Sequence, residues 1–488
     1  MNRTSSRRTK IVATLGPAWA TPPQMTALLD AGVNVVRVNA SHGTPTIRQQ
    51  WITELKSVLG TRRSSAAILL DLQGPRIRVG DLPVPLRLEQ GREVVFAPEP
   101  EVQVGEIPTT YEALARDVIS GSRILLDDGL LEVAVTGISG SRVRGVVVYG
   151  GELKSHKGMN LPGIEVSAPA LTDRDREDVR RAIDMGVDFI ALSFVRRPED
   201  MEELRALVPK TIRLVAKIEK DTAVRNLSSI IEASDAIMVA RGDLGVELPF
   251  EEVPLMQKRL IREANLQGKT VITATQMLES MVHAPRPTRA EASDVANAIL
   301  DGTDAVMLSA ETAVGEFPVE SVRAMDRIAR EMESNLRGRS PAYEAAVGHS
   351  RRKGEESEGV SAQRVAPVRS EADAIGLAVC VAAELLSAPL IVCFTSSGFT
   401  ARKVAAYRPA VPIFAVTPEP ETFRHLSLVW GVIPAFVDHM PNYDSMLEVA
   451  RQRILEHKLA DPGQPVVVTA GVPFDVPGTT NLLKVEHV

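Results

Sequence analysis

Charged and hydroxyl side chains interrupt or directly follow several short apolar runs, where a buried charge is costly unless it is paired or binds something. Lys217 and Glu219 are two residues apart in one such run, so both side chains point to the same face of a strand. The pair could simply neutralise each other. With Asp243 nearby, Glu219 and Asp243 could instead hold Mg²⁺ or Mn²⁺ through carboxylate oxygens, while Lys217 faces a substrate. The strand-end residues of this kind are Arg37, Asn39, Ser41, Asp71, Lys217, Glu219, Asp243, Thr275, Ser309 and Glu311.

Asp243 belongs to a glycine-rich segment, Ala-Arg-Gly-Asp-Leu-Gly over residues 240–245. Its glycines let the backbone approach a ligand, and a helix beginning there would present free N–H groups to a carboxylate or a phosphate. The motif alone is weak, because many turns between a strand and a helix look alike. The sequence contains neither G-x-x-x-x-G-K-[ST] nor G-x-G-x-x-G, which excludes the usual P-loop and dinucleotide folds as the holder of a nucleotide.

The elements that must position these side chains follow a repeated alternation of strand and helix patterns. Near-continuous apolar strands alternating with amphipathic helices imply a parallel sheet that is covered on both faces. Eight units predict an α/β fold, a (β/α)₈ TIM barrel, whose catalytic groups lie at the carboxyl ends of its strands. Only the third run lacks a following helix. The runs are 10–15, 33–39, 66–72, 188–194, 213–219, 236–240, 271–275 and 305–309.

Changes of pattern divide the chain further. After Gly80, short alternating runs with Gly and Pro predict a β-rich insert, which would be either a lid over the loop end of the barrel or a decorative insertion. A polar, irregular stretch from 337 to 370 favours a solvated connection over a binding tail. We predict a barrel over 1–79 and 169–340, a β-barrel-like lid over 80–168, a connecting segment over 341–370, and a C-terminal α/β effector-binding domain over 371–488.

Length and composition agree with a chain of several domains. The 488 residues suggest about three domains. A net charge of −6 argues against a general nucleic-acid-binding protein. The two cysteines, Cys380 and Cys393, lack metal-site spacing, so a reducing compartment is expected. No secretory signal and no apolar run near 18 residues is found, which predicts a cytoplasmic protein that does not enter a membrane.

The motifs resemble those of pyruvate kinases of the bacterial type, in the right order and over nearly the whole chain. The resemblance implies transfer of the phosphoryl group of phosphoenolpyruvate to ADP, giving pyruvate and ATP, the final step of glycolysis. It also implies a homotetramer. The segments that carry the resemblance are 9–17, 37–43, 157–163, 216–219, 241–247, 274–281, 285–291 and 307–312.

Roles for the acidic and basic residues are implied by this resemblance. Arg37 would clamp the phosphoryl group through its rigid fork. Lys217 would neutralise the charge that develops on the transferring group, which is an electrostatic task. Glu219 and Asp243 would bind the divalent metal, Mg²⁺ or Mn²⁺.

The remaining contacts to both substrates are implied in the same way. Backbone groups of Gly242 and Asp243, together with Thr275, would hold the substrate carboxylate, and Thr275 would lie near the position where the enolate is protonated. Closure of the lid would exclude water from the reaction. The nucleotide phosphates would be contacted by Asn39, His42, Arg78 and Lys157.

One segment departs from the commonest pattern of these enzymes. Many of them bind K⁺ through a site that includes Asn39, Ser41, Asp71 and the following residue, usually Thr, and they carry Glu where this chain has Arg76. Here Leu72 replaces the Thr. A guanidinium near the site could supply the positive charge that K⁺ supplies elsewhere, so we predict activity without K⁺. Members that dispense with K⁺ more often carry Lys at this position.

The C-terminal region contains four hydroxyl residues and a glycine between a strand and a helix. The pattern fits a phosphate cradle, and it fits ordinary helix capping equally well. The resemblance favours a site for a phosphorylated allosteric effector, a sugar phosphate or a nucleotide. The residues concerned are Thr395, Ser396, Ser397, Gly398 and Thr400.

Two other functions remain compatible with parts of the pattern. A Mg²⁺-dependent aldolase of pyruvate shares the two carboxylates and the cation, but needs neither the insert nor the last domain. A non-catalytic metabolite sensor would keep the barrel and bind ligands through the last domain. Against the sensor, the positions named above retain the chemical types that catalysis needs.

Overall fold

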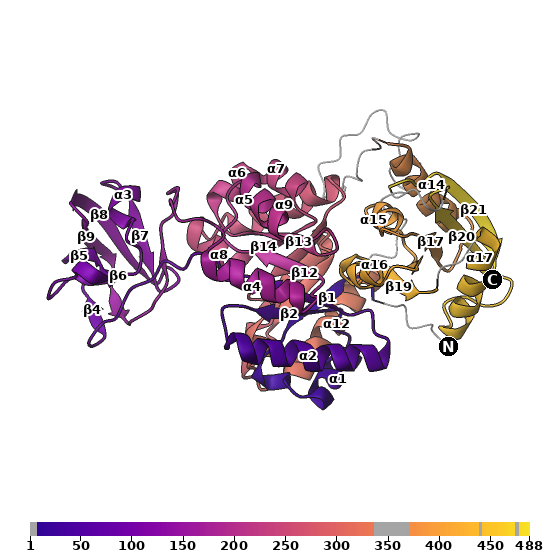
Figure 1. The fold of residues 1–488 in the computed structure, drawn as a ribbon, viewed down its shortest axis with the longest axis horizontal. Helices are drawn as coiled ribbons and strands as arrows, with labels where there is room; N and C mark the ends of the chain where they lie inside the picture. Colours follow the sequence, from indigo (N-terminus) through magenta and orange to yellow (C-terminus); the bar gives the residue numbers. More distant parts are fainter. Residues whose placement is uncertain (1–6, 336–367, 369, 439–441, 474–477) are drawn as a thin grey trace.

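The computed structural model describes residues 7–335, 368, 370–438, 442–473 and 478–488. The chain is arranged in three parts in a row, with an eight-stranded barrel between a β-rich insert and a C-terminal α/β domain (Figure 1). The (β/α)₈ barrel, the β-rich insert and the α/β domain predicted from the sequence are thereby confirmed. The predicted connecting segment, 341–370, lies outside the described residues except for Val368 and Ser370.

Eight parallel strands close the barrel in the order β1-β16-β15-β14-β13-β12-β3-β2. Nearly every residue of these strands is buried, because the barrel core packs against one face and the surrounding helices against the other. Each strand overlaps one of the eight predicted runs. Their bounds are β1 Lys10–Thr14, β2 Val35–Asn39, β3 Ala67–Asp71, β12 Phe189–Leu192, β13 Arg213–Ile218, β14 Ala236–Ala240, β15 Thr270–Ala274 and β16 Ala305–Leu308.

Helices surround the barrel, and several of them begin with the threonine caps that are typical of helix N-termini. Thr172 forms a capping box with Asp175, and Thr288 forms one with Glu291. In each case the threonine side chain accepts a hydrogen bond from a backbone N–H of the first turn, which has no carbonyl partner within the helix. The helical elements are η1 Pro17–Trp19, α1 Pro22–Ala31, α2 Pro45–Arg62, α4 Asp173–Asp184, α5 Pro198–Leu207, α6 Asp221–Arg225, α7 Leu227–Ala233, α8 Arg241–Glu247, α9 Val253–Leu266, η3 Glu279–Val282, α10 Arg289–Leu300, α11 Ala310–Ala313 and α12 Pro318–Asn335.

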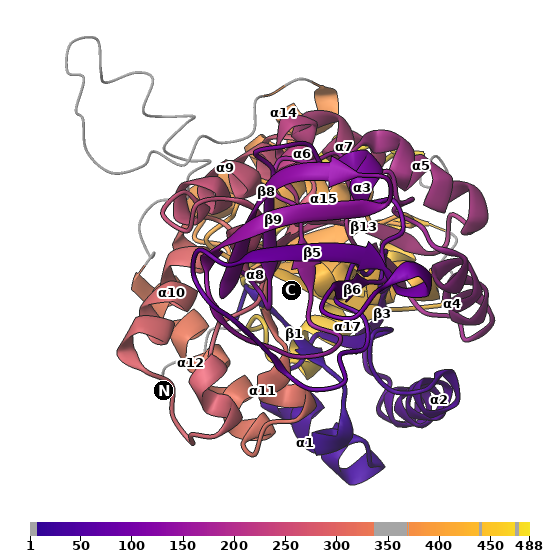
Figure 2. The ribbon, with the colours of Figure 1, turned by 90° about the vertical axis from the view of Figure 1, so that its left-hand side faces the viewer.

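The insert leaves the barrel after β3 and lies at the end where the carboxyl ends of the barrel strands are found (Figures 1 and 2). It consists of a six-stranded sheet, β11-β7-β8-β9-β5-β6, and a two-stranded sheet, β10-β4, around a core of its own. The predicted domain boundaries themselves stay predictions. Its elements are β4 Leu86–Leu88, β5 Glu93–Pro98, η2 Glu99–Glu101, β6 Ile107–Thr109, α3 Leu114–Asp117, β7 Arg123–Leu126, β8 Leu131–Ser139, β9 Arg142–Tyr149, β10 Gly151–Leu153 and β11 Met159–Asn160.

The C-terminal domain lies at the opposite, amino-terminal end of the barrel strands (Figure 1). There Lys10, the first residue of β1, donates a hydrogen bond from Nζ to the carbonyl oxygen of Val432 at 2.6 Å. The sheet order is β19-β18-β17-β20-β21, with only β21 antiparallel to its neighbour. Its elements are α14 Glu371–Leu385, β17 Ile391–Phe394, α15 Phe399–Ala405, β18 Ile413–Thr417, α16 Pro420–His425, η4 Leu426–Leu428, β19 Val432–Phe436, α17 Tyr443–Glu456, β20 Pro465–Ala470 and β21 Leu482–His487.

A search of the described helices finds none that is both long enough and apolar enough to span a bilayer.

Candidate active site

The side chains at the carboxyl ends of β2 and β3 form a buried ion pair. Arg37 donates from Nε and Nη2 to Oδ2 of Asp71, both at 2.7 Å, and from Nη1 to Oγ1 of Thr14 at 2.9 Å. Burial alone would raise the pKa of Asp71, but the charges of Lys217 and Arg37 outweigh it and hold that pKa below its usual value. Asp71 is therefore an anion that fixes the direction of the Arg37 guanidinium.

Lys217 lies at the centre of this cluster. Its Nζ lies 2.8 Å from Oε1 of Glu219 and 3.3 Å from Oδ1 of Asp71, and it donates a hydrogen bond to Oγ of Ser193 at 2.8 Å. Burial acts to lower the pKa of Lys217, yet the two carboxylates raise it above the usual lysine value, so the ammonium is charged. The same-face placement that the two-residue spacing predicts is found, and the two side chains do form an ion pair.

The pKa of Glu219 is also raised, but for a carboxyl group this favours the neutral form. Burial raises its pKa to about 7, the nearby charge of Lys217 opposes that rise, and the charge of Asp243 adds to it. Its Oε2 accepts a hydrogen bond from the backbone N–H of Phe194 at 2.7 Å. Two carboxylates that repel each other in this way favour a bound cation.

The donor set at this position suits a hard divalent ion. Across the described ranges, no three His, Cys, Asp or Glu side chains gather as a ready metal cluster. Glu219 is buried at the end of β13, whereas Asp243 is exposed in the first turn of α8. Two carboxylates with open positions fit Mg²⁺ or Mn²⁺, which keep waters and take oxygen atoms from a substrate.

Thr275 follows β15 in a strained backbone conformation. Its φ of 68° is in the left-handed region, which a β-branched residue rarely adopts. The strain is held by hydrogen bonds, because Oγ1 of Thr275 accepts from the N–H of Gly242 at 2.7 Å and donates to the carbonyl of Ala274 at 2.6 Å. Arg241 Nη2 also donates to the Thr275 carbonyl, at 2.6 Å. The turn after β15 is thereby tied to the start of α8.

A second basic group lies on the segment that leads from β3 into the insert. Burial lowers the pKa of Arg76 to about 10, and the neighbouring charges of Arg78 and Arg174 add to that effect. Burial, followed by the charges of Arg76, Arg37 and Arg78, lowers the pKa of His42. Within the described ranges, neither Arg76 nor Arg78 forms an ion pair with a carboxylate. This cluster has positive charge available for a polyanion.

The other predicted nucleotide contacts have partners within the protein. Asn39 accepts from the N–H of Ser41 at 3.0 Å through Oδ1, and its Nδ2 lies 3.1 Å from Nδ1 of His42. Lys157, on the insert, forms an ion pair with Asp127 at 2.8 Å. The backbone of Lys157 lies beside the segment that carries Arg78, since its carbonyl accepts from the N–H of Val79 at 2.9 Å.

Two of the residues predicted to form the monovalent-cation site are neighbours in the barrel, but a third has no side-chain ligand to offer. Asn39 and Asp71 are paired in the register of β2 and β3. Leu72 is buried and has no side-chain oxygen to offer a cation. The only polar groups that Leu72 contributes are its backbone N–H, which donates to Ala191, and its carbonyl, which accepts from Ser193 Oγ at 2.7 Å.

The predicted effector residues follow β17, with Thr395 to Gly398 before α15 and Thr400 in its first turn. Thr395 and Thr400 are buried, and Oγ1 of Thr400 lies 2.9 Å from Oγ1 of Thr480. Gly398 has a φ of 75°, and a Cβ built there would approach Arg402 Nη1 to 2.8 Å. Ser396 and Ser397 are partly exposed. Thr395 and Thr400 are therefore part of the packed interior, whereas Ser396 and Ser397 are partly open to solvent.

Three residues of the cluster were not anticipated from the sequence. Ser193 orients Lys217, Thr14 supports Arg37, and Arg241 ties the Thr275 turn to α8. Arg241 also pairs with Asp294 at 2.7 Å. Ser193 and Thr14 both lie inside predicted apolar runs near their carboxyl ends, so extending the search for polar strand ends to every run would have found them.

A (β/α)₈ barrel with a largely buried lysine, an oriented arginine, a carboxylate pair and an adjacent basic cluster defines an enzyme that acts on anionic substrates by electrostatic stabilisation. The comparisons with known proteins show its family. Residues 6–322 match the family "Pyruvate kinase, barrel domain", and residues 373–486 match "Pyruvate kinase, alpha/beta domain".

Relatives resemble this chain over almost its full length. It is 44% identical to a pyruvate kinase of Geobacillus stearothermophilus, over 99% of this chain and 80% of that protein, and 41% identical to one of Clostridium acetobutylicum, over 99% and 100%. The crystal structure of a pyruvate kinase from Cryptosporidium parvum superposes with a TM-score of 0.90 at 35% identity, covering 99% of this chain and 96% of that one. The chain belongs to the pyruvate kinase family, whose members transfer a phosphoryl group from phosphoenolpyruvate to ADP and release pyruvate and ATP.

Proposed function

We propose that the cluster of Arg37, Lys217, Glu219 and Asp243 carries out the phosphoryl transfer. The observation that carries this proposal is the position of Lys217 Nζ, held within 2.8 to 3.3 Å of Ser193, Glu219 and Asp71. Those three contacts orient a charged ammonium before any substrate arrives, and preorganised charge is the main source of catalysis in phosphoryl transfer.

Arg37 and Lys217 act on the phosphoryl group of phosphoenolpyruvate. Arg37 clamps its oxygens with the guanidinium nitrogens that Asp71 orients, and Lys217 offsets the charge that spreads over the equatorial oxygens during transfer. Glu219 and Asp243 would hold the divalent metal, Mg²⁺ or Mn²⁺, which when bound neutralises substrate oxygens as a Lewis acid. Coupled measurement of ATP formation from phosphoenolpyruvate and ADP, with Lys217→Met beside the wild type, tests these roles together.

Thr275 and the start of α8 serve the other end of the same substrate. The N–H of Asp243, in the first turn of α8, suits its carboxylate, and the N–H of Gly242, which donates to Thr275 Oγ1 in this structure, would be shared with that carboxylate when the substrate binds. The Thr275 hydroxyl, which accepts from the Gly242 N–H, would serve the step in which the enolate left by phosphoryl transfer takes up a proton. The left-handed backbone at Thr275 supports a functional reason for the strain. Thr275→Ala should slow proton exchange at the pyruvate methyl group more than it weakens phosphoenolpyruvate binding.

The nucleotide would be held by the basic cluster and the lid. Asn39 ends β2 and His42 follows it, whereas the backbone of Lys157, on the insert, lies beside the segment that carries Arg78. Closure of the insert would keep water away from the phosphoryl group, so that ADP and not water receives it. Replacement of residues 82–165 by a short Gly-Ser linker tests this role, and transfer to ADP that persists at the wild-type rate would contradict it.

K⁺ independence is proposed from the chemistry of Leu72 and Arg76. Pyruvate kinases generally use K⁺ as well as a divalent metal, but Leu72 offers no side-chain ligand, while Arg76 adds a positive charge near Arg78. The test replaces KCl with tetramethylammonium chloride at constant ionic strength. Turnover that falls more than tenfold would refute K⁺ independence.

Regulation is proposed at the loop between β17 and α15. The partly exposed Ser396 and Ser397 and the N-terminal N–H groups near Gly398 suit the phosphate of a sugar phosphate or nucleotide effector. A panel of sugar phosphates and AMP at low phosphoenolpyruvate tests this site. If no member of the panel changes the rate, the proposed effector site is refuted.

Assembly and location follow the family resemblance. We propose a homotetramer, measurable by light scattering of the purified protein, and catalysis in the cytoplasm, where a glycolytic enzyme meets its substrates. No nucleic-acid or membrane partner is expected.

A further inference from the structure

Arg48, near the start of α2, is a buried arginine that does not belong to the cluster around Lys217. Only 3% of its surface is exposed. An arginine keeps its charge in the interior, so its burial is costly unless the guanidinium is paired and hydrogen-bonded. The groups that satisfy Arg48 therefore show which parts of the chain it holds in place.

One nitrogen of the Arg48 guanidinium binds the backbone of the loop that follows β2. Nη1 donates to the carbonyl oxygens of Ala40 at 3.1 Å, His42 at 3.2 Å and Gly43 at 2.9 Å. Gly43 has a φ of 68°, which a glycine adopts without strain, so the loop can turn there before it enters α2. Carbonyl oxygens that face a buried cation are kept from facing a bound anion, which they would repel.

The other terminal nitrogen of Arg48 is anchored to α4. Nη2 lies 2.8 Å from Oδ1 of Asp178, a carboxylate that is itself buried. A guanidinium can bind a carboxylate and several carbonyls at once because its nitrogens form a rigid fork, which the ammonium of a lysine does not have. The loop that carries His42 is thereby linked, through one side chain, to a helix that lies 130 residues further along the chain.

The same helix holds a second segment of the proposed nucleotide site. Asp175 of α4 is fully buried, and its Oδ1 accepts a hydrogen bond at 3.1 Å from the N–H of Gly74, on the segment that leads from β3 to Arg78. Asp175 and Asp178 are three residues apart, so they lie on the same side of the helix. Helix α4 thus fixes the loop of His42 and the segment of Arg78 relative to each other.

The cluster around Lys217 depends on other contacts. Arg37 is oriented by Asp71 and Thr14, and Asp71 also faces Lys217. The strand that carries Arg37, β2, is held by its ladders with β1 and β3. Loss of Arg48 should therefore release the loop after β2 without displacing the groups that act on the phosphoryl donor.

We propose that Arg48 is a positioning residue for the acceptor nucleotide, which holds the loop of His42 in place, through Asp178 of α4, beside the segment of Arg78. The inference rests on the nucleotide contacts proposed above and adds to them a residue that does not touch the substrate. A loop that is ordered in advance spares the nucleotide the cost of ordering it on binding. Its release should weaken the binding of ADP more than that of phosphoenolpyruvate.

The test measures KM for ADP and KM for phosphoenolpyruvate separately, by ATP formation with the full-length protein. Arg48→Met keeps much of the side-chain volume and should raise KM for ADP roughly tenfold or more, since hydrogen bonds to a charged group are lost. KM for phosphoenolpyruvate and kcat should change less than about threefold. Arg62→Met is the matched control, because Arg62 is on the same helix and pairs with Asp30 at the surface, and it should leave both KM values unchanged.

Three further variants separate positioning from general damage to the fold. Asp178→Asn keeps the shape of the anchor but removes its charge, and it should also raise KM for ADP. The double variant of Arg48→Met and Asp178→Asn should be no worse than Arg48→Met alone, because both changes release the same loop and the second removes an unpaired buried charge. Arg48→Lys should restore part of the ADP affinity, since it keeps the charge without the fork.

Equal increases in the two KM values would overturn the inference, and so would an unchanged KM for ADP in a folded Arg48→Met protein. Should Arg48→Met fail to fold, Asp178→Asn decides by the same comparison. A wild-type protein that forms no ATP would contradict the proposed function and the inference together. Wild-type turnover, with no separation of the two KM values in the variants, would contradict the role of Arg48 alone.

Discussion

Replacement of Lys217 by Met removes the charge at the centre of the buried cluster while keeping much of its volume. In the wild type, the positive charges of Arg37 and Lys217 balance the negative charges of Asp71 and Glu219. In the variant one negative charge is uncompensated. Glu219, whose pKa is already raised to about 7, should then take up a proton more readily and relieve part of the imbalance.

The expected loss of rate follows from the role of preorganised charge. Removal of one aligned donor from a developing anion costs about 2.7 to 4 kcal/mol, or roughly 10²- to 10³-fold in kcat. A charge in direct contact with a transferring phosphoryl group is worth roughly 10³- to 10⁵-fold. Because Lys217 is partly offset by two carboxylates, we expect kcat to fall by about 10³-fold, where these two ranges meet. KM for phosphoenolpyruvate should change much less, since Arg37 remains to bind it.

Two assays separate the possible outcomes. ATP formation reports phosphoryl transfer, and deuterium exchange into the methyl group of pyruvate reports proton transfer alone. Lys217→Met should lose the first and keep most of the second. Lys220→Met is the matched control, because Lys220 pairs with Glu247 outside the cluster and should retain kcat within a few-fold. A Lys217→Met enzyme within tenfold of the wild type, or one that loses both activities equally, would refute the assignment.

Three further outcomes are expected. Ser193→Ala removes the hydroxyl that orients Lys217 and should lower kcat about fivefold, as expected for the ~1 kcal/mol of one hydrogen bond; an unchanged kcat in the ATP assay would contradict this. Burial lowers the pKa of Lys10 from 10.5 to about 7. Between these two pH values the unfolded chain binds more protons than the folded one. The free energy of unfolding should therefore rise with pH in this range, by at most about 1.4 kcal/mol per pH unit. Thermal unfolding at pH 7 to 9 should show this slope in the wild type and not in Lys10→Met, and equal slopes would be evidence against it. Leu72→Thr combined with Arg76→Glu should make turnover depend on K⁺ at least tenfold, measured against tetramethylammonium, and a double variant indifferent to K⁺ would show that these positions do not set the requirement.

Local sequence patterns were sufficient to predict the architecture of the protein and part of its candidate site. Eight apolar runs predicted the eight barrel strands, and the missing helix after 66–72 predicted the position of the insert. The two-residue spacing of Lys217 and Glu219 predicted that they share a face. These features depend on periodicity within a few residues, which the chain carries in its own order. In the C-terminal domain, β19 and β21 were not predicted.

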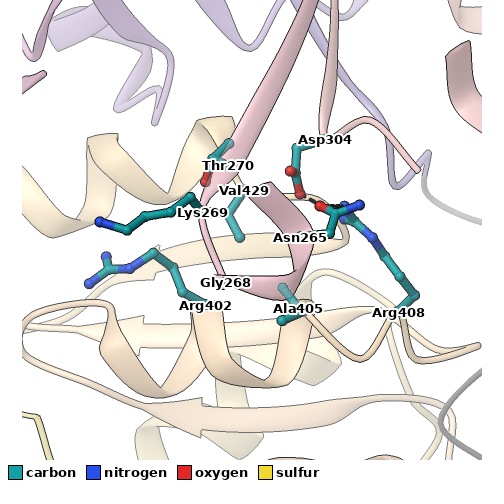
Figure 3. A pocket seen from close by; sticks show the side chains of 10 residues that line it. Asn265, Gly268, Lys269, Thr270, Asp304, Arg402, Ala405, Arg408 and Val429 are labelled. Atoms are coloured by element: carbon teal, nitrogen blue, oxygen red, sulfur yellow. Dashed lines mark hydrogen bonds and ion pairs between the residues drawn. The ribbon is translucent and has the colours of Figure 1, made fainter. Parts of the chain in front are cut away.

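The contacts between elements required the folded chain. Arg37 and Lys217 come from β2 and β13, which are separated by β3 and β12 in the barrel, and only the closed strand order brings their side chains to one anion, Asp71. The strained backbone of Thr275 depends equally on a partner outside its own strand. The pocket lined by Lys269 and Arg402 exists only because two domains pack together (Figure 3). Spacing along a strand determines the direction of a side chain, whereas the distance between side chains of different elements depends on barrel closure and domain packing, which no local pattern records.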